Sequence, residues 1–237
     1  MRTPTTHPSR AATERQDQPP VLEAASLYRF FRAGDEEILA LRGVSVTLYP
    51  GELVAIVGPS GSGKSTLLAC LAGLDEPDGG AVRVDGARIS HQPERLRARL
   101  RAQRIGVLYQ DRNLLRHLTV TQNIALAQQI AGAVPQSHPR VLLASLGIAE
   151  RGAAYPSQLS GGESARAGLA VALANDPVVI LADEPTGELD GDTESDVLAV
   201  LRGRADAGTA ILIASHSPAV MAIADRIVTL ADGRVVP

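Results

Sequence analysis

A glycine-rich stretch at residues 58–66 constrains this chain more than any other feature. Its sequence, GPSGSGKST, fits the pattern G-x-x-x-x-G-K-[ST], in which glycines let successive backbone N–H groups point inward. The apolar run 53–57 before it is typical of a strand, and the residues after it have the spacing of a helix. A tight loop that leads into a helix N-terminus favours an anion. The stretch therefore predicts binding of a nucleotide phosphate.

The single lysine of the chain lies inside this loop. Lysine and arginine together number 23, so Lys64 stands against 22 arginines. A compact ammonium fits between phosphate oxygens better than a planar guanidinium does. We expect Lys64 to reach the β- and γ-phosphates and the Ser65 hydroxyl to hold Mg²⁺. The alternative interpretation is a glycine-rich turn that joins a strand to a helix by chance.

Length and composition fit one α/β domain. The chain has 237 residues, of which 45% are apolar, enough for one sizeable core. A net charge of −3 gives no overall attraction to nucleic acid, so we expect no nucleic-acid partner. The one cysteine, Cys70, excludes a disulfide framework and fits a reducing compartment. Because no stretch reaches the roughly 20 apolar residues of a membrane span, we expect a cytoplasmic protein.

The N-terminal part combines a polar tail with an aromatic cluster. Residues 1–20 have almost no aliphatic side chains and are expected to form a flexible tail. Three of the six aromatic residues occupy positions 28–31, which either pack within a strand or offer a flat face for an adenine ring. Residues 34–37 are typical of a turn, and residues 44–48 alternate as a strand.

Two further apolar runs lead into polar side chains. Residues 178–182 precede Asp183 and Glu184, and residues 210–214 lie just before His216. Continuously apolar strands are typical of a buried parallel sheet, which binds ligands at its carboxyl ends. Asp183 is then positioned to hold Mg²⁺ through water and Glu184 to polarise an attacking water. The alternatives are an acidic helix cap for the carboxylates and a structural role for His216.

The remaining sequence is mainly helical. Residues 94–104 carry five arginines at helical spacing, typical of a solvated face, with a contact to lipid headgroups or a partner as the alternative. The apolar run 105–109 is expected to be a strand that ends before Gln110. Residues 119–147 have helical spacing interrupted near prolines. The segment 158–163 leads into another helix, as an ordinary Ser-Gly cap would.

The order of these motifs resembles that of the nucleotide-binding subunit of ATP-binding cassette (ABC) transporters. The likeness covers roughly Val21 to Val236, and within it the segments 34–37, 73–75 and 183–190 look most like the lipoprotein-releasing and macrolide-exporter branch. The motifs that carry the resemblance are the phosphate loop, Gln110, the signature Leu159-Ser160-Gly161-Gly162-Glu163, Asp183-Glu184, Leu189-Asp190 and His216.

This resemblance implies a fold and an activity. The fold is α/β, a P-loop NTPase RecA-like core with an antiparallel β subdomain and a helical subdomain. Residues 21–237 would form a single ABC ATPase domain, with the helical subdomain at about residues 111–165. The activity would be ATP hydrolysis with Mg²⁺ that powers a separate integral-membrane permease, for export or extraction of a hydrophobic or peptide-like substrate or a lipoprotein. The protein would be peripheral on the inner face of the cell membrane.

The resemblance also assigns roles to single residues. Phe31 would stack on adenine, while Glu184 would act as general base or water-positioner and His216 would stabilise the γ-phosphate. Lys64 and Gln110 would act in catalysis as well as in binding. The metal ligands would be Ser65, Gln110 and Asp183. The residues that cradle the triphosphate would be Gly58, Ser60, Gly61, Ser62, Gly63, Lys64, Ser65 and Thr66.

A second subunit is part of what the resemblance implies. In the family the signature segment completes the site of the opposite subunit across a head-to-tail dimer, which here would be a homodimer or a heterodimer with a related chain. The loop at Asp190 would connect the two sites. The residues that would face the partner's nucleotide are Ser160, Gly161, Gly162, Glu163 and Asp190.

Several positions depart from the family pattern, although none removes a catalytic group, so we expect an active site. Phe31 stands where relatives more often carry Tyr, and Ser217 replaces the common Asp after the histidine. Glu188 replaces a frequent Asn or Ala. The positions where many relatives have longer polar or charged side chains are Ser164, Ala165 and Val171.

Two other functions stay open at this point. A cassette ATPase can gate or regulate a membrane protein without transport, and the sequence does not separate that role from transport. The second is a soluble ATPase of the DNA-repair or translation class. Those relatives usually carry coiled coils, zinc-binding cysteines or two cassettes, whereas this chain has one cysteine and one cassette.

Overall fold

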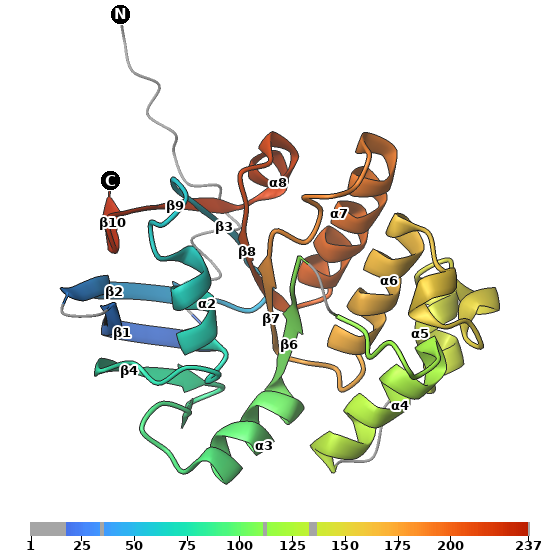
Figure 1. Cartoon of the computed structure of the whole chain (residues 1–237), viewed down its shortest axis with the longest axis horizontal. Coiled ribbons are helices and arrows are strands. Elements are labelled where there is room, and N and C mark those ends of the chain that lie inside the picture. Colours follow the sequence, from blue (N-terminus) through green and yellow to red (C-terminus); the bar gives the residue numbers. More distant parts are fainter. Residues whose placement is uncertain (1–17, 34–35, 111–112, 133–136, 237) are drawn as a thin grey trace, which may run out of the picture.

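Two β-sheets and a group of helices make up the fold (Figure 1). The computed structural model describes residues 18–33, 36–110, 113–132 and 137–236. Most of the predicted tail, residues 1–17, lies outside these ranges. Among the described residues, no helix has the length and apolar character needed to cross a membrane.

The larger sheet has six strands in the order β10-β9-β3-β8-β7-β6. All neighbours in it are parallel except β10, which pairs antiparallel with β9. The central strands are the apolar runs that the sequence predicted. Its strands are β3 (Leu53–Val57), β6 (Ile105–Leu108), β7 (Val179–Asp183), β8 (Ala210–Ala214), β9 (Arg226–Ala231) and β10 (Arg234–Val236).

Side chains along the central strands alternate between two cores. On β3, Val54 and Ile56 pack into the core shared with the smaller sheet, whereas Leu53 and Ala55 pack into the core under the helices. A strand buried on both faces has no solvent-facing position, which explains the continuously apolar sequence.

The smaller sheet is antiparallel, in the order β2-β1-β4-β5. Its second strand begins at Glu36, so the predicted turn at residues 34–37 is wrong in its second half. Glu36 and Glu37 instead pair with Ala33 and Arg32, because the ladder continues to the end of the first strand. Residues 34 and 35 lie outside the described ranges. The strands are β1 (Leu22–Ala33), β2 (Glu36–Leu48), β4 (Gly79–Val84) and β5 (Ala87–Arg88).

Some helices lie between the two sheets, and others cover the side of the larger sheet that faces away from the smaller one. Figure 1 shows α2 between the sheets and α4 to α6 at the side opposite β1 and β2. The helical spacing predicted for residues 119–147 is divided into separate short helices, the second of which begins at Pro139. The elements are α2 (Lys64–Leu71), α3 (Glu94–Arg104), α4 (Val120–Ala131), α5 (Pro139–Ser145), α6 (Gly161–Ala172), α7 (Gly191–Asp206), α8 (Pro218–Ile223) and the 3₁₀ turns η1 (Ala149–Arg151) and η2 (Pro156–Gln158).

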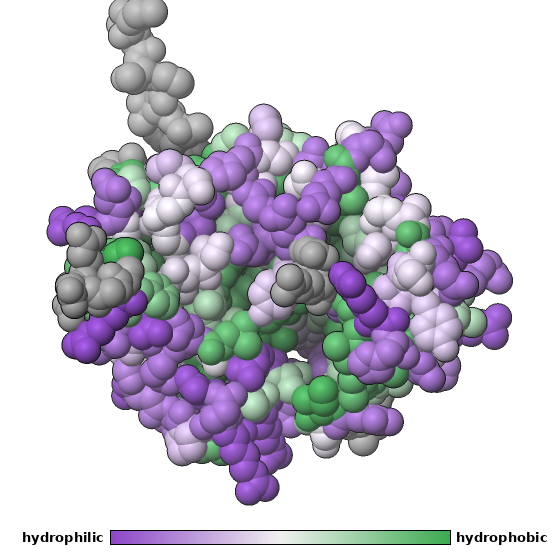
Figure 2. All heavy atoms as spheres, in the orientation of Figure 1, coloured by the Kyte–Doolittle hydropathy of each residue, from purple (hydrophilic) through white to green (hydrophobic). Residues whose placement is uncertain are grey.

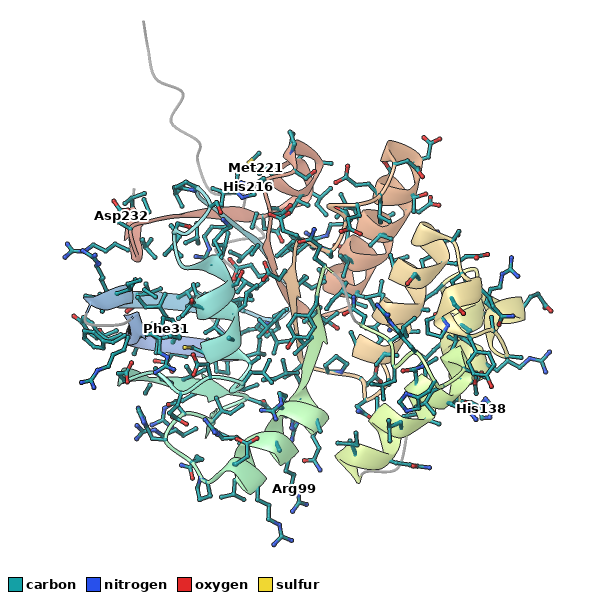
Figure 3. The ribbon with its side chains drawn as sticks, viewed as in Figure 1. Phe31, Arg99, His138, His216, Met221 and Asp232 are labelled. Atoms are coloured by element: carbon teal, nitrogen blue, oxygen red, sulfur yellow. The ribbon has the colours of Figure 1, made fainter. Side chains whose placement is uncertain are left out.

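The arginine-rich segment forms α3, and none of its residues is buried. Hydrogen bonds from Arg101 and Arg97 lower the pKa of Glu94 below its ordinary value. Arg99 points away from the body of the molecule (Figure 3). The charges of this helix are therefore partly neutralised locally, as expected for a solvated face.

The close packing of α6 against β6 generates a stability prediction. A Cβ at Gly106 would lie 2.5 Å from the backbone oxygen of Ala172. Gly106→Ala is therefore expected to lower the free energy of unfolding by about 1–3 kcal/mol, the usual cost of overpacking. Urea unfolding measures this change. Gly203→Ala on α7 is the control, because nothing lies within 4 Å of its Cβ; it should be neutral or stabilising by up to about 1 kcal/mol. Equal losses in both variants would contradict the argument.

Candidate functional site

The carboxyl ends of the parallel strands and the N-terminus of α2 surround a cleft of about 530 Å³. Figure 3 shows Phe31, His216 and Asp232 coming from three separate elements around this end of α2. The structure thus brings together residues that are distant in the sequence. Of the predicted site residues, those that line the cleft are Phe31, Ser60, Gly61, Gly63, Lys64, Ser65, Thr66, Gln110, Asp183, Glu184 and His216.

The phosphate loop is pressed between backbone groups of both sheets. A Cβ at Gly58 would lie 2.0 Å from the Leu230 carbonyl oxygen, and one at Gly63 would lie 2.5 Å from the Ala40 carbonyl oxygen. Gly63 is also in the left-handed region, with φ of 104°, and no described side chain caps the first amides of α2. Those N–H groups and the helix dipole are therefore available to an anion.

Lys64 is buried and its ammonium lies over the loop. Nζ donates to the backbone oxygens of Gly58 at 2.7 Å and Pro59 at 3.1 Å, and lies 3.3 Å from His216 Nε2. Nearby, Ser62 Oγ is buried and has no hydrogen-bond partner within the described part of the chain. Buried polar atoms are normally satisfied, so this hydroxyl fits a loop whose polar groups are completed by a ligand.

Glu184 follows the last residue of β7 in a strained backbone conformation, with φ of 46°. Its N–H donates to Ala214 on β8 at 2.9 Å, which extends the strand pairing by one residue. The carboxylate accepts a hydrogen bond from Ser215 Oγ at 2.8 Å and lies 3.7 Å from His216 Nε2. Glu184 and His216 are therefore neighbours at the cleft.

The predicted metal ligands also meet at the cleft. Ser65, Gln110 and Asp183 all line it. Within the described ranges, no three His, Cys, Asp or Glu side chains are grouped so that they alone could hold a metal ion. Mg²⁺ in phosphate sites uses few carboxylates and completes its shell with water and phosphate oxygens. A hydroxyl, an amide oxygen and one carboxylate therefore fit Mg²⁺ bound together with a nucleotide.

The ring of Phe31, the predicted platform for adenine, is in contact with the guanidinium of Arg29. The guanidinium carbon of Arg29 lies 4.7 Å from the centroid of the Phe31 ring. Arg29 is held by two hydrogen bonds to Asp75, each 2.8 Å long, and one of 3.1 Å to Asp78. One face of the ring is thus covered by a cation that is fixed by carboxylates.

The signature segment lies outside the described lining of this cleft. Ser160 is the N-cap of α6: its Oγ accepts from the Glu163 N–H, and Glu163 Oε2 accepts from the Ser160 N–H at 2.9 Å. The Ser160 N–H and then Arg151 lower the pKa of Glu163. Gly161 is exposed beside them. The segment is therefore an ordinary capping box within its own chain.

Asp190 likewise stands apart from the cleft and caps α7. Its carboxylate accepts from the Thr193 N–H at 2.9 Å and from the Thr193 hydroxyl at 3.1 Å. These bonds lower the pKa of Asp190. A Cβ at Gly162 would lie 2.4 Å from Thr193 Cγ2, so α6 and α7 meet at this threonine.

The sequence interpretation missed the part of the cleft that comes from β2 and from the β9–β10 turn. The Asp-Gly pair at 232–233 is a hairpin signal, but nothing local places it beside the phosphate loop. The Gly233 N–H donates to the Ser62 backbone oxygen at 3.1 Å. The missed lining residues are Ile38, Leu39, Ala40, Arg42, Asp232 and Gly233.

The structure shows where the residues that depart from the family pattern lie and what they contact. Ser164, Ala165 and Glu188 line one hollow of about 150 Å³ next to Gln110. Ser217 caps α8 and donates through Oγ to a carboxylate of α7. Val171 is partly buried and packs against the core under the helices.

Comparisons with known proteins agree with this geometry. The sequence profile of the ABC transporter family matches residues 41–187. The chain is 46% identical over 222 residues to the lipoprotein-releasing system ATP-binding protein LolD of Maricaulis maris, covering 92% of this chain and 96% of that protein. It is 42% identical over 220 residues to the macrolide export ATP-binding/permease protein MacB of Shigella flexneri, covering 92% of this chain. It spans only 34% of that longer protein.

A solved structure gives the same fold. The ATP-binding cassette MJ0796, in a dimeric post-hydrolysis state bound to ADP and Pi, superposes with a TM-score of 0.84 at 32% identity. The match covers 91% of this chain and 97% of that one. The predicted P-loop ABC fold is confirmed, and so is the assignment to ABC-type ATPases.

The brace behind Phe31 generates a prediction about pH. The Phe30 N–H, at 2.8 Å from Oδ2, and then Arg29 lower the pKa of Asp78 below its ordinary value. A carboxyl with a lowered folded-state pKa contributes stability above its unfolded-state pKa, and this is lost as the pH falls through the folded-state value. Asp78→Asn should therefore be less stable than the unmodified chain at pH 7, by under about 1 kcal/mol because the side chain is 40% exposed.

That difference should shrink below about pH 4. Urea unfolding at a series of pH values compares the two proteins. A difference of the same size at pH 3 and pH 7 would contradict the role assigned to the Asp78 carboxylate.

Proposed function

This chain belongs to the ABC transporter family, and we propose that it is the ATP-hydrolysing subunit that powers a separate membrane permease. The observation that carries the proposal is the joint placement of Lys64, Asp183, Glu184 and His216 at one cleft beside the phosphate loop. The near full-length match to a LolD protein, which is named as the ATP-binding protein of a release system, supports a separate permease chain.

Lys64 and the first amides of α2 would hold the β- and γ-phosphates. Ser65, Gln110 and Asp183 would hold Mg²⁺, which when bound neutralises phosphate charge. Phe31 would stack on adenine with its free face. Together these groups bind and orient the triphosphate.

Glu184 would then act on water. Its Oε1 takes a proton while the water oxygen forms a bond to the γ-phosphorus, and the bond from that phosphorus to the β–γ bridging oxygen breaks. The electron pair of the broken bond leaves with ADP. His216 lies 3.3 Å from Lys64 and 3.7 Å from Glu184, a place from which it can contact the γ-phosphate.

A head-to-tail pair of subunits is part of the proposal. Ser160 to Glu163 and Asp190 stand outside the cleft of their own chain, whereas the helix N-terminus at Gly161 suits a phosphate. The dimeric MJ0796 cassette supports an arrangement in which a second copy or a related chain supplies these residues. ATP would join the two subunits, and hydrolysis would release them.

A small apolar hollow of about 140 Å³ offers a place for the permease. It lies between α2 and β6, and Figure 2 shows hydrophobic surface on this face of the molecule. Leu74 and Tyr109 at its rim are 45% and 43% exposed. Ser65 and Asp183 are among its lining residues, so the hollow adjoins the proposed Mg²⁺ ligands. We propose that the permease, at the inner face of the membrane, contacts the subunit at this hollow.

The proposed substrate class is based on the names of the relatives. We propose export or extraction of a lipoprotein or another hydrophobic or peptide-like molecule, since the LolD and MacB relatives are named for lipoprotein release and macrolide export. Gating of a membrane protein without transport is the second candidate, because its ATPase would have the same cleft. ATP-driven movement of substrate in reconstituted vesicles separates the two. Stimulation of hydrolysis by DNA or ribosomes, and by no permease, would overturn both.

Dimer formation gives a first test. Glu184→Gln removes the proposed base but keeps the size of the side chain, so ATP should bind without being hydrolysed. Size-exclusion chromatography should then show an ATP-dependent dimer, and hydrolysis should fall about 100-fold or more. Lys64→Ala in the same background should abolish the dimer, because the phosphate contact is lost. A monomer at all ATP concentrations, with the permease present as well, would count against the head-to-tail arrangement.

Permease coupling gives a second test. Leu74→Asp places a charge at the rim of the apolar hollow, so the permease concentration needed for half-maximal stimulation of the ATPase should rise about tenfold, equivalent to roughly 1.4 kcal/mol of binding. Basal hydrolysis should change little. Val141→Asp is the control, since Val141 is 60% exposed and its helix, α5, lies on the opposite side of the molecule from α2 (Figure 1). Equal effects of both variants would show that the hollow is not the docking place.

A further inference from the structure

A buried serine lies between the two strand ends that carry Glu184 and His216. Ser215 directly follows β8 and is 2% exposed. Its N–H donates to the Ile56 carbonyl oxygen on β3 at 3.1 Å, and its Oγ lies 2.8 Å from Glu184 Oε2. The Ser217 N–H lies 3.1 Å from the same Oγ. Ser215 is thus fixed by its backbone and has two partners for its hydroxyl.

The direction of these hydrogen bonds follows from the groups involved. A backbone N–H can only donate, so Ser217 donates to Ser215 Oγ. An ionised carboxylate can only accept, so the hydroxyl proton of Ser215 points to Glu184 Oε2. The hydrogen bonds therefore run in one direction, from Ser217 to Ser215 and from Ser215 to Glu184.

A second carboxylate, that of Glu194, accepts a hydrogen bond from Ser217, the first residue in this series of hydrogen bonds. Glu194 Oε1 on α7 accepts from Ser217 Oγ at 2.7 Å and from Thr186 Oγ1 at 2.9 Å. Thr186 is 4% exposed and lies two residues after Glu184. Glu194 therefore bonds to the loop after β7 and to the loop after β8, the two loops that hold Glu184 and Ser215.

We infer that Ser215 is a positioning residue for hydrolysis, which fixes the Glu184 carboxylate through Oε2, and that Glu194 holds Ser215 in place through Ser217. With Oε2 engaged, Oε1 is the oxygen nearer His216 and the one that receives the proton of the attacking water. Without the hydroxyl, the carboxylate can rotate about its terminal torsion, which is broad and soft. The inference rests on the proposed role of Glu184 as the base.

The pairing of Ser217 with Glu194 also gives a physical meaning to a departure from the family pattern. An Asp at position 217, the residue expected there from the family resemblance, would place a second carboxylate against Glu194 Oε1. Like charges at hydrogen-bond distance disfavour each other. A hydroxyl at this position instead donates to Glu194, so Ser217 and Glu194 are matched in this chain.

Steady-state hydrolysis by the full chain tests the inference. Ser215→Ala should lower kcat about 10- to 100-fold, because the base is no longer oriented. KM for ATP should change less than about twofold, since Ser215 is buried and is not among the residues that line the cleft. Ser215→Thr keeps the hydroxyl and should recover most of the activity. An unchanged kcat for Ser215→Ala, or a Thr variant as slow as the Ala variant, overturns the inference.

A matched control separates positioning from general loss of stability. Ser90 is also 2% exposed, and its Oγ accepts from the Val82 N–H at 2.9 Å, far from Glu184 in the chain. Ser90→Ala should leave kcat unchanged. If Ser215→Ala does not fold, as judged by its unfolding transition, Ser215→Cys keeps the size with a weak donor and should show the same fall in kcat.

The Glu184→Gln variant distinguishes failure of this inference from failure of the proposed function. Hydrolysis retained by Glu184→Gln would remove Glu184 as the base. Loss of hydrolysis in Glu184→Gln with normal hydrolysis in Ser215→Ala would overturn the positioning role alone. For Glu194→Ala we expect a fall in kcat that does not add to that of Ser215→Ala, because both act through one carboxylate. Additive losses would exclude Glu194 from the chain of contacts.

Discussion

The phosphate loop depends on two backbone carbonyls that press against it. Leu230 on β9 approaches Gly58, and Ala40 on β2 approaches Gly63, in both cases more closely than any Cβ permits. The loop is therefore packed directly against both sheets. One consequence is that the platform at Phe31, carried by the smaller sheet, is fixed relative to the phosphate site in the larger sheet. A nucleotide that spans both would thus meet a preformed geometry, which lowers the cost of binding.

The order of strands in the larger sheet determines which chemical groups meet. Because β8 lies between β3 and β7, the segment after β8 can contact the loop that follows β3 and the carboxylates that follow β7. Ser215 shows this directly, since its N–H bonds to Ile56 on β3 and its hydroxyl to Glu184 after β7. Parallel strands place all three ends at one edge, so a short polar segment on the central strand connects both neighbours.

The features predicted correctly from the sequence are those that depend on neighbouring residues in the chain. Gly58 to Thr66, the buried strands and the residues at their ends were correctly located, because a continuously apolar strand and a glycine-rich turn are local signals. Asp232 was missed because its place at the cleft depends on β9 being a neighbour of β3. Arg42 was missed because β2 belongs to the other sheet and reaches the cleft through its contact with the β9–β10 turn, where the Arg42 N–H donates to Gly233. The start of β2 at Glu36 was missed for a similar reason: pairing with β1 overrode a composition typical of a turn. The Ser160 cap is local and was recognised, whereas the Ser215 contact is made between distant segments.

Helix α7 connects the surface proposed for the second subunit with the proposed base. Asp190 caps its N-terminus, and Thr193 packs against Gly162 at the start of α6. Glu194, one residue further, holds the loops of Glu184 and Ser215. These contacts lie within one turn of a helix, an element that moves as a unit. We propose that a second subunit that engages Ser160 acts through Gly162 and Thr193 on the turn of α7 that carries Glu194, so that closure of the dimer and alignment of the base would share one structural element.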